Sequence, residues 1–144
     1  MTITRTYGWD MGHRLQRHRG LCRNLHGHRY TAEVTVKGLI QIRGRRAGMV
    51  MDFHDLDVAI RGILEPWDHA MMLEASDPAL ALLRGFRIGG RLRVVEFGLP
   101  PTAENIAVEI RDRLASSWVG MPPGVDVCTV RVYETPRSWA ETTV

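Results

Sequence analysis

The stretch that most constrains the fold is a run of alternating polar and apolar residues, Arg29–Lys37, that directly follows His26-Gly27-His28. Such alternation predicts a β-strand, on which residues two positions apart point to the same face. His26 and His28 should therefore project side by side, as a pair of metal ligands must. A thiol at Cys22 and a further imidazole at His13 lie just upstream.

Three neutral imidazoles with an open fourth coordination position describe a catalytic zinc site. Two other interpretations compete with this one. The His-Gly-His pattern can be a chance occurrence at a surface or core position. Alternatively, Cys22 can join His13, His26 and His28 in a closed set of four ligands, which would describe a structural zinc site. The spacing alone leaves all three open.

The remaining periodicities predict an α+β fold. Strands are predicted at 2–11, 28–40, 91–97 and 125–134, with a weak edge strand at 138–143. Helices are predicted from about Asp52 to Pro66, from Asp77-Pro78 to about Arg84, and from a Thr102 cap along an apolar stripe that reaches Trp118. Consecutive strands with helices grouped between them predict a four-stranded antiparallel sheet with helices on one face. No repeat or linker divides the chain, so residues 1–144 are expected to form a single domain.

Composition limits the choice of partners and compartment. Of the 144 residues, 44% are apolar and 24% charged, as in ordinary soluble proteins. No segment has the length and apolarity of a membrane span or signal peptide, so we expect a cytoplasmic protein with no membrane partner. Two cysteines, Cys22 and Cys128, are too few for a disulfide framework. The formal charge of +3 is spread along the chain, which argues against a nucleic-acid partner.

Three further groups of polar residues can carry chemistry. Asp68-His69 follows the end of a predicted helix, and the carboxylate can orient the imidazole, although an ordinary surface pair is the alternative. Glu134 shares the apolar face of its strand, where a carboxylate is costly unless it is paired. A nitrogen heterocycle with an amino group and a ring N–H would pair with it; an edge position is the alternative. Thr102 and Glu104 form a polar helix entrance, which helix capping explains equally well.

Four arginines surround the thiol in sequence. They can hold a phosphate chain and lower the pKa of the Cys22 thiol, because cationic neighbours favour the thiolate. A solvated loop is the alternative interpretation. The four residues are Arg14, Arg17, Arg19 and Arg23.

Taken together and in this order, these motifs resemble one family, the 6-pyruvoyltetrahydropterin synthases and the similar 6-carboxytetrahydropterin synthases of the queuosine and deazapurine route. The resemblance spans nearly the whole chain. The matching pieces are His13, Cys22 before His26-Gly27-His28, Gly48 to Asp52-Phe53, Asp68-His69, Pro101–Asn105 and Glu134-Thr135.

The resemblance implies a tunnelling fold, in which antiparallel sheets of several subunits join into a barrel. It also implies a homo-oligomer, a hexamer built from two trimers, with active sites at subunit interfaces. The resemblance also implies roles for individual residues. Zn²⁺ would be bound by His13, His26 and His28. The general base would be Cys22, with Asp68 and His69 as its catalytic partners, and the pterin would be bound by Glu134, Thr102 and Glu104.

The family substrate is 7,8-dihydroneopterin triphosphate. Three residues separate Cys22 from His26, a spacing that resembles the bacterial enzymes forming 6-carboxy-5,6,7,8-tetrahydropterin with release of acetaldehyde and triphosphate. This lyase activity is the predicted function, and 6-pyruvoyltetrahydropterin formation is the alternative within the family. A zinc-stabilised nucleic-acid-binding module is the alternative from another class. The chain departs from the family pattern at Trp67, at Leu73-Glu74, at Ala103 and in the longer segment 75–98.

Overall fold

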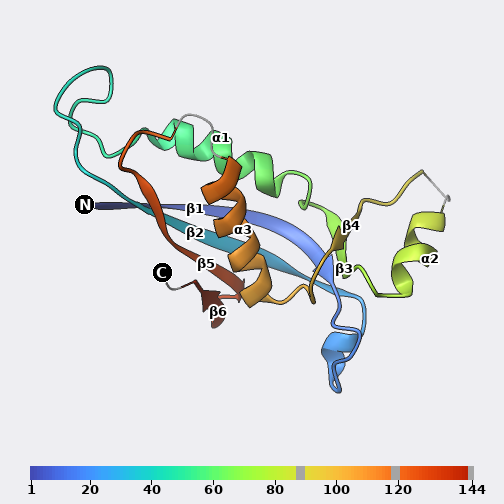
Figure 1. The fold of residues 1–144 in the computed structure, drawn as a ribbon. Coiled ribbons are helices and arrows are strands. Elements are labelled where there is room, and N and C mark those ends of the chain that lie inside the picture. The colour runs from blue at the N-terminus through green and yellow to red at the C-terminus, as the bar shows by residue number, and fades with distance from the viewer. Residues whose placement is uncertain (87–89, 118–120, 143–144) are drawn as a thin grey trace.

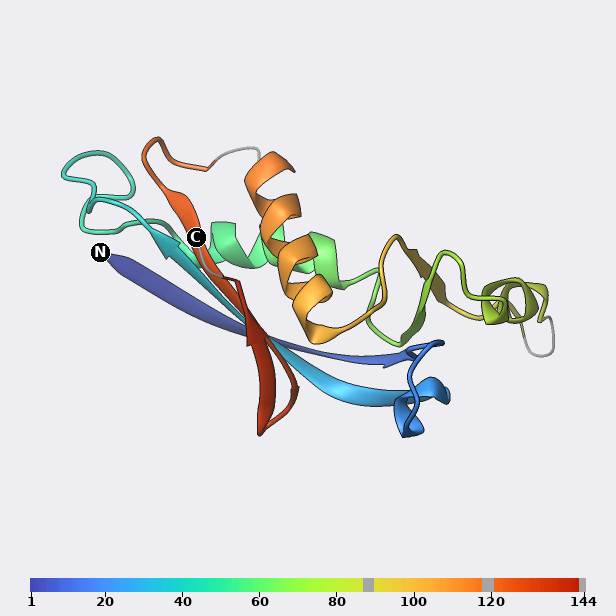
Figure 2. The same cartoon turned by 60° about the horizontal axis from the view of Figure 1, so that its bottom comes forward.

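The computed structural model describes residues 1–86, 90–117 and 121–142. Within these residues, six strands form one sheet in the order β4-β3-β1-β2-β5-β6. Helices α1 and α3 lie together against one face of the sheet, called here the covered face, and neither lies on the opposite, open face (Figure 1, Figure 2). In chain order the elements are β1 (Thr2–His13), the 3₁₀ turn η1 (Leu21–Arg23), β2 (His26–Lys37), α1 (Phe53–Leu64), β3 (Ala70–Glu74), α2 (Ala79–Gly85), β4 (Val94–Phe97), α3 (Ala103–Ser117), β5 (Asp126–Thr135) and β6 (Ser138–Glu141).

The β1–β2 pair is the backbone of the fold. The two strands are antiparallel and stay in register along their whole length, from Thr2 opposite Lys37 to His13 opposite His26. Alternate residues of both strands are buried on the covered face, among them Trp9 and Tyr30, whose rings stack at 5.2 Å between centroids. The strands and the buried face that the alternating sequence predicts are therefore present in the structure.

The helices begin and end where local sequence signals place them. The Asp52 side chain accepts a hydrogen bond from the backbone N–H of His54 at 2.8 Å and caps α1. Thr102 accepts one from the N–H of Asn105 at 3.3 Å and caps α3. The apolar stripes of both helices are buried against the sheet, and Trp118, predicted on the α3 stripe, lies outside the described residues.

The sheet differs from the predicted one in size and in direction. The sequence predicts four antiparallel strands, whereas the structure adds β3 and the predicted weak edge strand β6 to the sheet, and β3 runs parallel to both β1 and β4. The strand β3 is short and nearly all apolar, so it lacks the alternation that reveals a strand in sequence. Its direction follows from the connection, because α1 carries the chain back across the covered face before β3 begins. The α+β class with helices on one face is confirmed.

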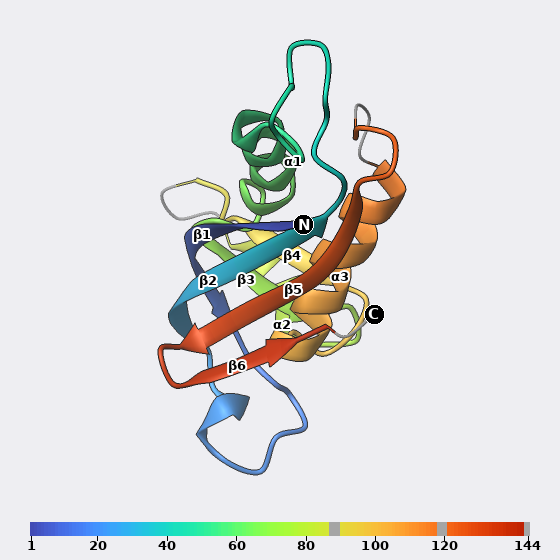
Figure 3. The same ribbon diagram turned by 90° about the vertical axis from the view of Figure 1, so that its left-hand side faces the viewer.

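In Figure 3, β2, β5 and β6 lie in front, with α1 above them and α3 to the right of β5. The long β1–β2 pair therefore presents one row of side chains to the helices and the other row to the open face. Among the described residues, no helix is long and apolar enough to cross a membrane.

Candidate metal centre and active site

Three imidazoles converge on the covered face at the end of the β1–β2 pair. His13 ends β1, and His26 and His28 begin β2. The ring centroids lie 4.5 Å apart for His13 and His26, 5.0 Å for His26 and His28, and 5.2 Å for His13 and His28. One ring nitrogen from each lies within 4.8 Å of the other two, so the group can hold one metal ion.

Hydrogen bonds to the backbone orient two of these rings. The Nδ1–H of His13 donates to the carbonyl oxygen of Pro101 at 2.8 Å, and that of His26 donates to Asn24 at the same distance. A neutral imidazole that donates through Nδ1 keeps its lone pair on Nε2, and many metal-binding histidines are oriented by such a hydrogen bond from the nitrogen that does not bind the metal. The Nε2 atoms of His13 and His28 are buried, and neither has a hydrogen-bond partner among the described residues. These buried, unpaired acceptors fit a metal ion.

The electrostatics of the site favour the metal-binding form of the imidazoles. Burial lowers the pKa of His13 and of His28 below the ordinary value, because the imidazolium is disfavoured away from water. Both rings are therefore neutral at pH 7. Among the described residues the metal group contains three imidazoles and no thiol, so Cys22 does not complete a closed set of four ligands.

Gly27, which separates the two histidines of β2, lies where β1 and β2 approach each other closely. It lies on the open face opposite Gly12 of β1. A Cβ atom at Gly27 would lie 3.1 Å from the carbonyl oxygen of Met11, closer than most side chains tolerate. The strands can therefore approach closely where they carry the imidazoles.

Glu134 of β5 lies beside the imidazoles, on the apolar face that its strand parity predicts. Its Oε1 is 3.3 Å from Nε2 of His13 and 3.8 Å from Nε2 of His28. The hydroxyl of Tyr30 donates to the same oxygen at 3.5 Å. Burial first, and then the Glu134 charge, raise the pKa of Tyr30, so this hydroxyl stays a donor. The carboxylate is outside the group of ligand atoms that share one metal position.

A cavity of about 260 Å³ opens next to Glu134. Thr102 and Glu104, at the start of α3, line it together with Glu134, as the resemblance implies. Thr102 also caps its helix, so the two interpretations of this residue are compatible. Ala103, noted in the sequence as a departure from the family pattern, also lines it, and the remaining lining residues, which the sequence did not single out, are Leu15, Ser138 and Trp139.

Cys22 lies in the η1 turn of the loop between β1 and β2, and its thiol is free and half-buried. Tyr30 was missed in the sequence, although its spacing of two from His28 continues the row of His26 and His28.

The arginines around the thiol fall into two kinds. Arg14 pairs with Asp77 at 2.5 Å and Arg17 with Glu74 at 3.5 Å, so their charges are already matched. Arg19 and Arg23 are exposed, and neither side chain has an ion pair within the described part of the chain. Of the four arginines that the sequence offers for a phosphate chain, these two are available.

Asp68 and His69 lie elsewhere, beyond the β1 edge and toward the open face. The Asp68 carboxylate accepts from the backbone N–H of Asp10 at 2.9 Å and lies 3.1 Å from Nδ1 of His69. Hydrogen bonding from Asp10, and then His69, hold the pKa of Asp68 below its ordinary value. The structure therefore keeps the predicted pair together.

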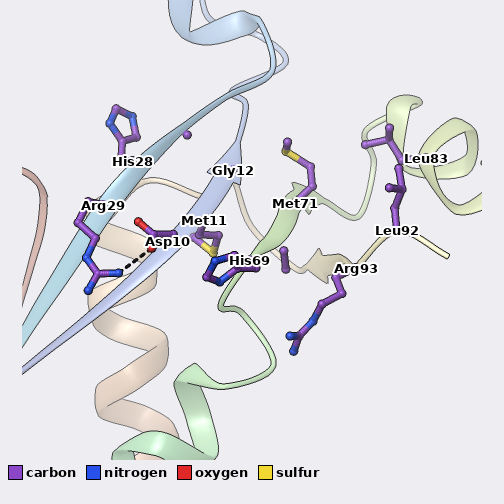
Figure 4. A pocket seen from close by; sticks show the side chains of 12 residues that line it. Asp10, Met11, Gly12, His28, Arg29, His69, Met71, Leu83, Leu92 and Arg93 are labelled. Carbon is purple, nitrogen blue, oxygen red and sulfur yellow. Dashed lines mark hydrogen bonds and ion pairs between the residues drawn. The ribbon is translucent and has the colours of Figure 1, made fainter. Parts of the chain in front are cut away.

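His69 borders a larger cavity, of about 590 Å³, on this open face. Its floor is the facing glycine pair Gly12 and Gly27, and Arg29 and Arg93 stand at its polar rim (Figure 4). The His28 ring projects from β2 away from His69 (Figure 4). The imidazole of His69 is 71% exposed and is therefore accessible to another molecule.

The backbone of His69 is unusual. Its φ of 57° lies in the left-handed region, where a residue other than glycine is strained. Its N–H donates to the carbonyl oxygen of Asp10 at 2.7 Å, which ties the strained residue to the edge of β1. Strain retained at a polar, exposed residue is a common mark of a functional position.

Comparison with known proteins identifies relatives along the whole chain. The family model "6-pyruvoyl tetrahydropterin synthase" matches residues 2–143. The 6-carboxy-5,6,7,8-tetrahydropterin synthase of Haemophilus influenzae is 33% identical over 142 residues, covering 96% of each chain. The protein of that name from Aquifex aeolicus is 31% identical, covering 96% of this chain and 95% of the relative.

Solved structures share the fold. An uncharacterized protein from Wolinella succinogenes superposes with a TM-score of 0.81 at 25% identity, over 99% of this chain and 97% of the other. The 6-pyruvoyl tetrahydropterin synthase of Caenorhabditis elegans superposes with a TM-score of 0.69 at 22% identity, over 100% of this chain and 95% of the other, and this likeness concerns the fold alone.

Proposed function

Because the chain belongs to the 6-pyruvoyl tetrahydropterin synthase family, we propose that it is a zinc-dependent 6-carboxy-5,6,7,8-tetrahydropterin synthase. Its substrate would be 7,8-dihydroneopterin triphosphate, and acetaldehyde and triphosphate would be released. One observation carries the proposal: three imidazoles, two of them with a buried and unpaired Nε2, lie close to Glu134, which lines a cavity with Thr102 and Glu104. The names of the full-length relatives favour the carboxy-forming branch over the pyruvoyl-forming one.

In this proposal His13, His26 and His28 hold zinc. The bound metal would supply Lewis acidity toward the hydroxyls of the substrate side chain and acidify the adjacent C–H. Burial lowers the pKa of His13 and of His28, which favours the neutral imidazole that a metal ion needs and supports this assignment.

Glu134 is proposed to anchor the pterin ring. An ionised carboxylate has two acceptor oxygens, which match the exocyclic amino group and ring N–H of a pterin. Thr102 and Glu104 line the same cavity and would complete the ring contacts. Anchoring the ring fixes the side chain of the substrate relative to the imidazoles and the thiol.

Cys22 is proposed as the general base, which takes the acidified proton as a thiolate. Asp68 would hold the imidazole of His69 in one orientation, and His69 would return a proton to the side chain of the substrate. Arg19 and Arg23, exposed beside the thiol, are suited to the triphosphate leaving group.

Among the described contacts, no hydrogen bond or ion pair joins Asp68 or His69 to the loop that carries Cys22. We therefore infer that a neighbouring subunit supplies Asp68 and His69, in a homo-oligomer that joins sheets into a barrel. The exposure of His69 and the cavity beside it support this inference. The same proposal includes one catalytic domain per chain, a hexamer of two trimers, a cytoplasmic setting and a product that feeds 7-deazaguanine or queuosine synthesis.

The test is incubation of the zinc-loaded protein with 7,8-dihydroneopterin triphosphate, with triphosphate and acetaldehyde measured together. We expect both products in equal amounts. Triphosphate without acetaldehyde would assign the chain to the pyruvoyl-forming branch. Absence of both products, with zinc bound, would refute the proposed lyase activity.

A further inference from the structure

The loop that carries Cys22 is held by a segment far away in sequence. The first arm of this loop, residues 14–17, packs against residues 74–77, which connect β3 to α2. The guanidinium of Arg14 makes two parallel bonds to the Asp77 carboxylate, from Nε to Oδ2 at 2.6 Å and from Nη2 to Oδ1 at 2.5 Å. The Asp77 side chain is fully buried and that of Arg14 is 23% exposed, so water screens this pair only weakly.

Asp77 is itself fixed in place. Its Oδ1 also accepts a hydrogen bond from the backbone N–H of Ala79, the first residue of α2, at 2.8 Å. The bond from Arg14 holds the pKa of Asp77 below its ordinary value, so the carboxylate is ionised at neutral pH. Arg14 is therefore anchored to a rigid helix start rather than to a mobile side chain.

Glu74 adds two more contacts to the same arm. The side-chain N–H of Gln16 donates to Glu74 Oε2 at 2.9 Å and to the hydroxyl of Ser76 at 2.7 Å. Arg17 Nη2 lies 3.5 Å from Glu74 Oε1. Residues 74–77 thus hold side chains 14, 16 and 17, and we call this segment the loop clamp.

The clamped arm in turn holds the thiol. The backbone N–H of Leu15 donates to the carbonyl oxygen of Cys22 at 2.8 Å. Leu15 lies between the clamped residues Arg14 and Gln16, so a displacement of the clamp moves the backbone of Cys22. The ordering of the turn itself is local, because Asn24 N–H donates to the carbonyl oxygen of Leu21 at 2.9 Å.

We propose that Asp77 and Glu74 are positioning residues that fix the Cys22 loop, and with it the thiol, relative to the ends of β1 and β2 that carry the imidazoles. They touch neither the metal group nor the cavity at Glu134, and they act through Arg14, Gln16 and Leu15. The role in turnover rests on the proposed function, whereas the placement of the thiol does not. This gives a function to the beginning of the long segment after β3, which the family resemblance leaves without one.

The decisive variant is Asp77→Asn. Asparagine keeps an oxygen that can accept from Ala79 and so preserves the start of α2, but it removes the charge that holds Arg14. The matched control is Glu96→Gln, because Glu96 forms an exposed ion pair with Arg84 at 2.9 Å in the same region and has no contact with the thiol loop among those described. Both variants are studied as the full-length, zinc-loaded protein.

Three quantities are measured: zinc content, the rate of iodoacetamide alkylation at Cys22 identified by peptide mass, and steady-state kinetics. For Asp77→Asn we expect unchanged zinc, a several-fold faster alkylation, and a kcat lower by about 10- to 100-fold with a nearly constant KM. Glu96→Gln should match the wild type in all three. A folded Asp77→Asn protein with wild-type alkylation would overturn the proposal, whatever its kcat.

Two further variants test the link between Arg14 and Asp77, and the second also serves if Asp77→Asn does not fold. Arg14→Met combined with Asp77→Asn should show no larger alkylation change than either single variant, because both remove the same link; additive effects would contradict a shared link. If Asp77→Asn does not fold, Arg14→Lys keeps the charge but loses the paired geometry, and wild-type alkylation in that variant would equally refute the clamp. Alkylation needs no substrate, so it still tests the clamp if the proposed lyase activity fails.

Discussion

A composite active site can be tested by mixing two inactive variants of this chain, Cys22→Ala and His69→Ala. Each variant lacks one of the two groups proposed to move protons. Cys22 lies in the η1 turn between β1 and β2, whereas His69 lies 71% exposed at a cavity on the open face. If each active site takes its thiol from one subunit and its imidazole from the next, a mixed oligomer contains some intact sites.

The size of the recovery follows from counting. In oligomers assembled at random from equal amounts of both chains, roughly half of the sites receive an intact thiol, and roughly half of their neighbours supply an intact His69. About one quarter of the sites then hold both groups, so we expect about one quarter of the wild-type activity. A site formed within a single chain would recover nothing, because each chain carries one defect.

The assay is triphosphate release by co-expressed chains with two different affinity tags, purified through both tags so that only mixed oligomers are measured. The matched control pairs Cys22→Ala with Glu134→Ala. If Cys22 and Glu134 of one chain serve the same site, this mixture should show no more activity than the residual activity of Glu134→Ala alone. Activity no higher than that of the separate variants in the first mixture, or recovery in the control, would refute the shared site.

Three other substitutions test individual roles. Cys22→Ala should abolish triphosphate release but leave the zinc content, measured by elemental analysis, unchanged; loss of zinc would instead indicate that the thiol is a ligand. Glu134→Ala should weaken pterin binding by roughly 10- to 100-fold, as expected for the loss of charged hydrogen bonds, and unchanged affinity in a titration would exclude the anchor. His69→Gly should remove turnover while the free energy of unfolding stays constant or rises by about 1 kcal/mol, because glycine relieves the strain at φ 57°. A clear destabilisation in urea denaturation would contradict that reasoning.

The parts of the site that follow from strand parity could be predicted from the sequence. The two-residue period places His26, His28 and Tyr30 in one row, and the same period places Glu134 on the inner side of β5. Residue types at helix starts likewise predict the caps at Asp52 and Thr102. These features are local, because the backbone geometry of a few residues determines them.

The remaining features depend on contacts between distant segments. Arg14 and Asp77 are 63 positions apart, and nothing in either neighbourhood marks them as partners. The strand β3 was missed because its five residues lack alternation, and its parallel pairing depends on where α1 returns the chain. Sequence patterns of short period cannot encode such pairings, since they arise only when the elements pack.

The connection from α1 to β3 also explains why the proposed site is divided between subunits. The helix lies on the covered face, and the chain must leave that face to join the sheet beside β1, which it does at Asp68 and His69 through two backbone-anchored hydrogen bonds to Asp10. The turn therefore points its polar side chains away from the core that α1 and α3 occupy. The three imidazoles come together within one chain because the β1–β2 register alone places them. In the proposed function the acid–base pair serves the active site of another subunit. Metal binding would then depend on one strand pair, and turnover would depend on assembly.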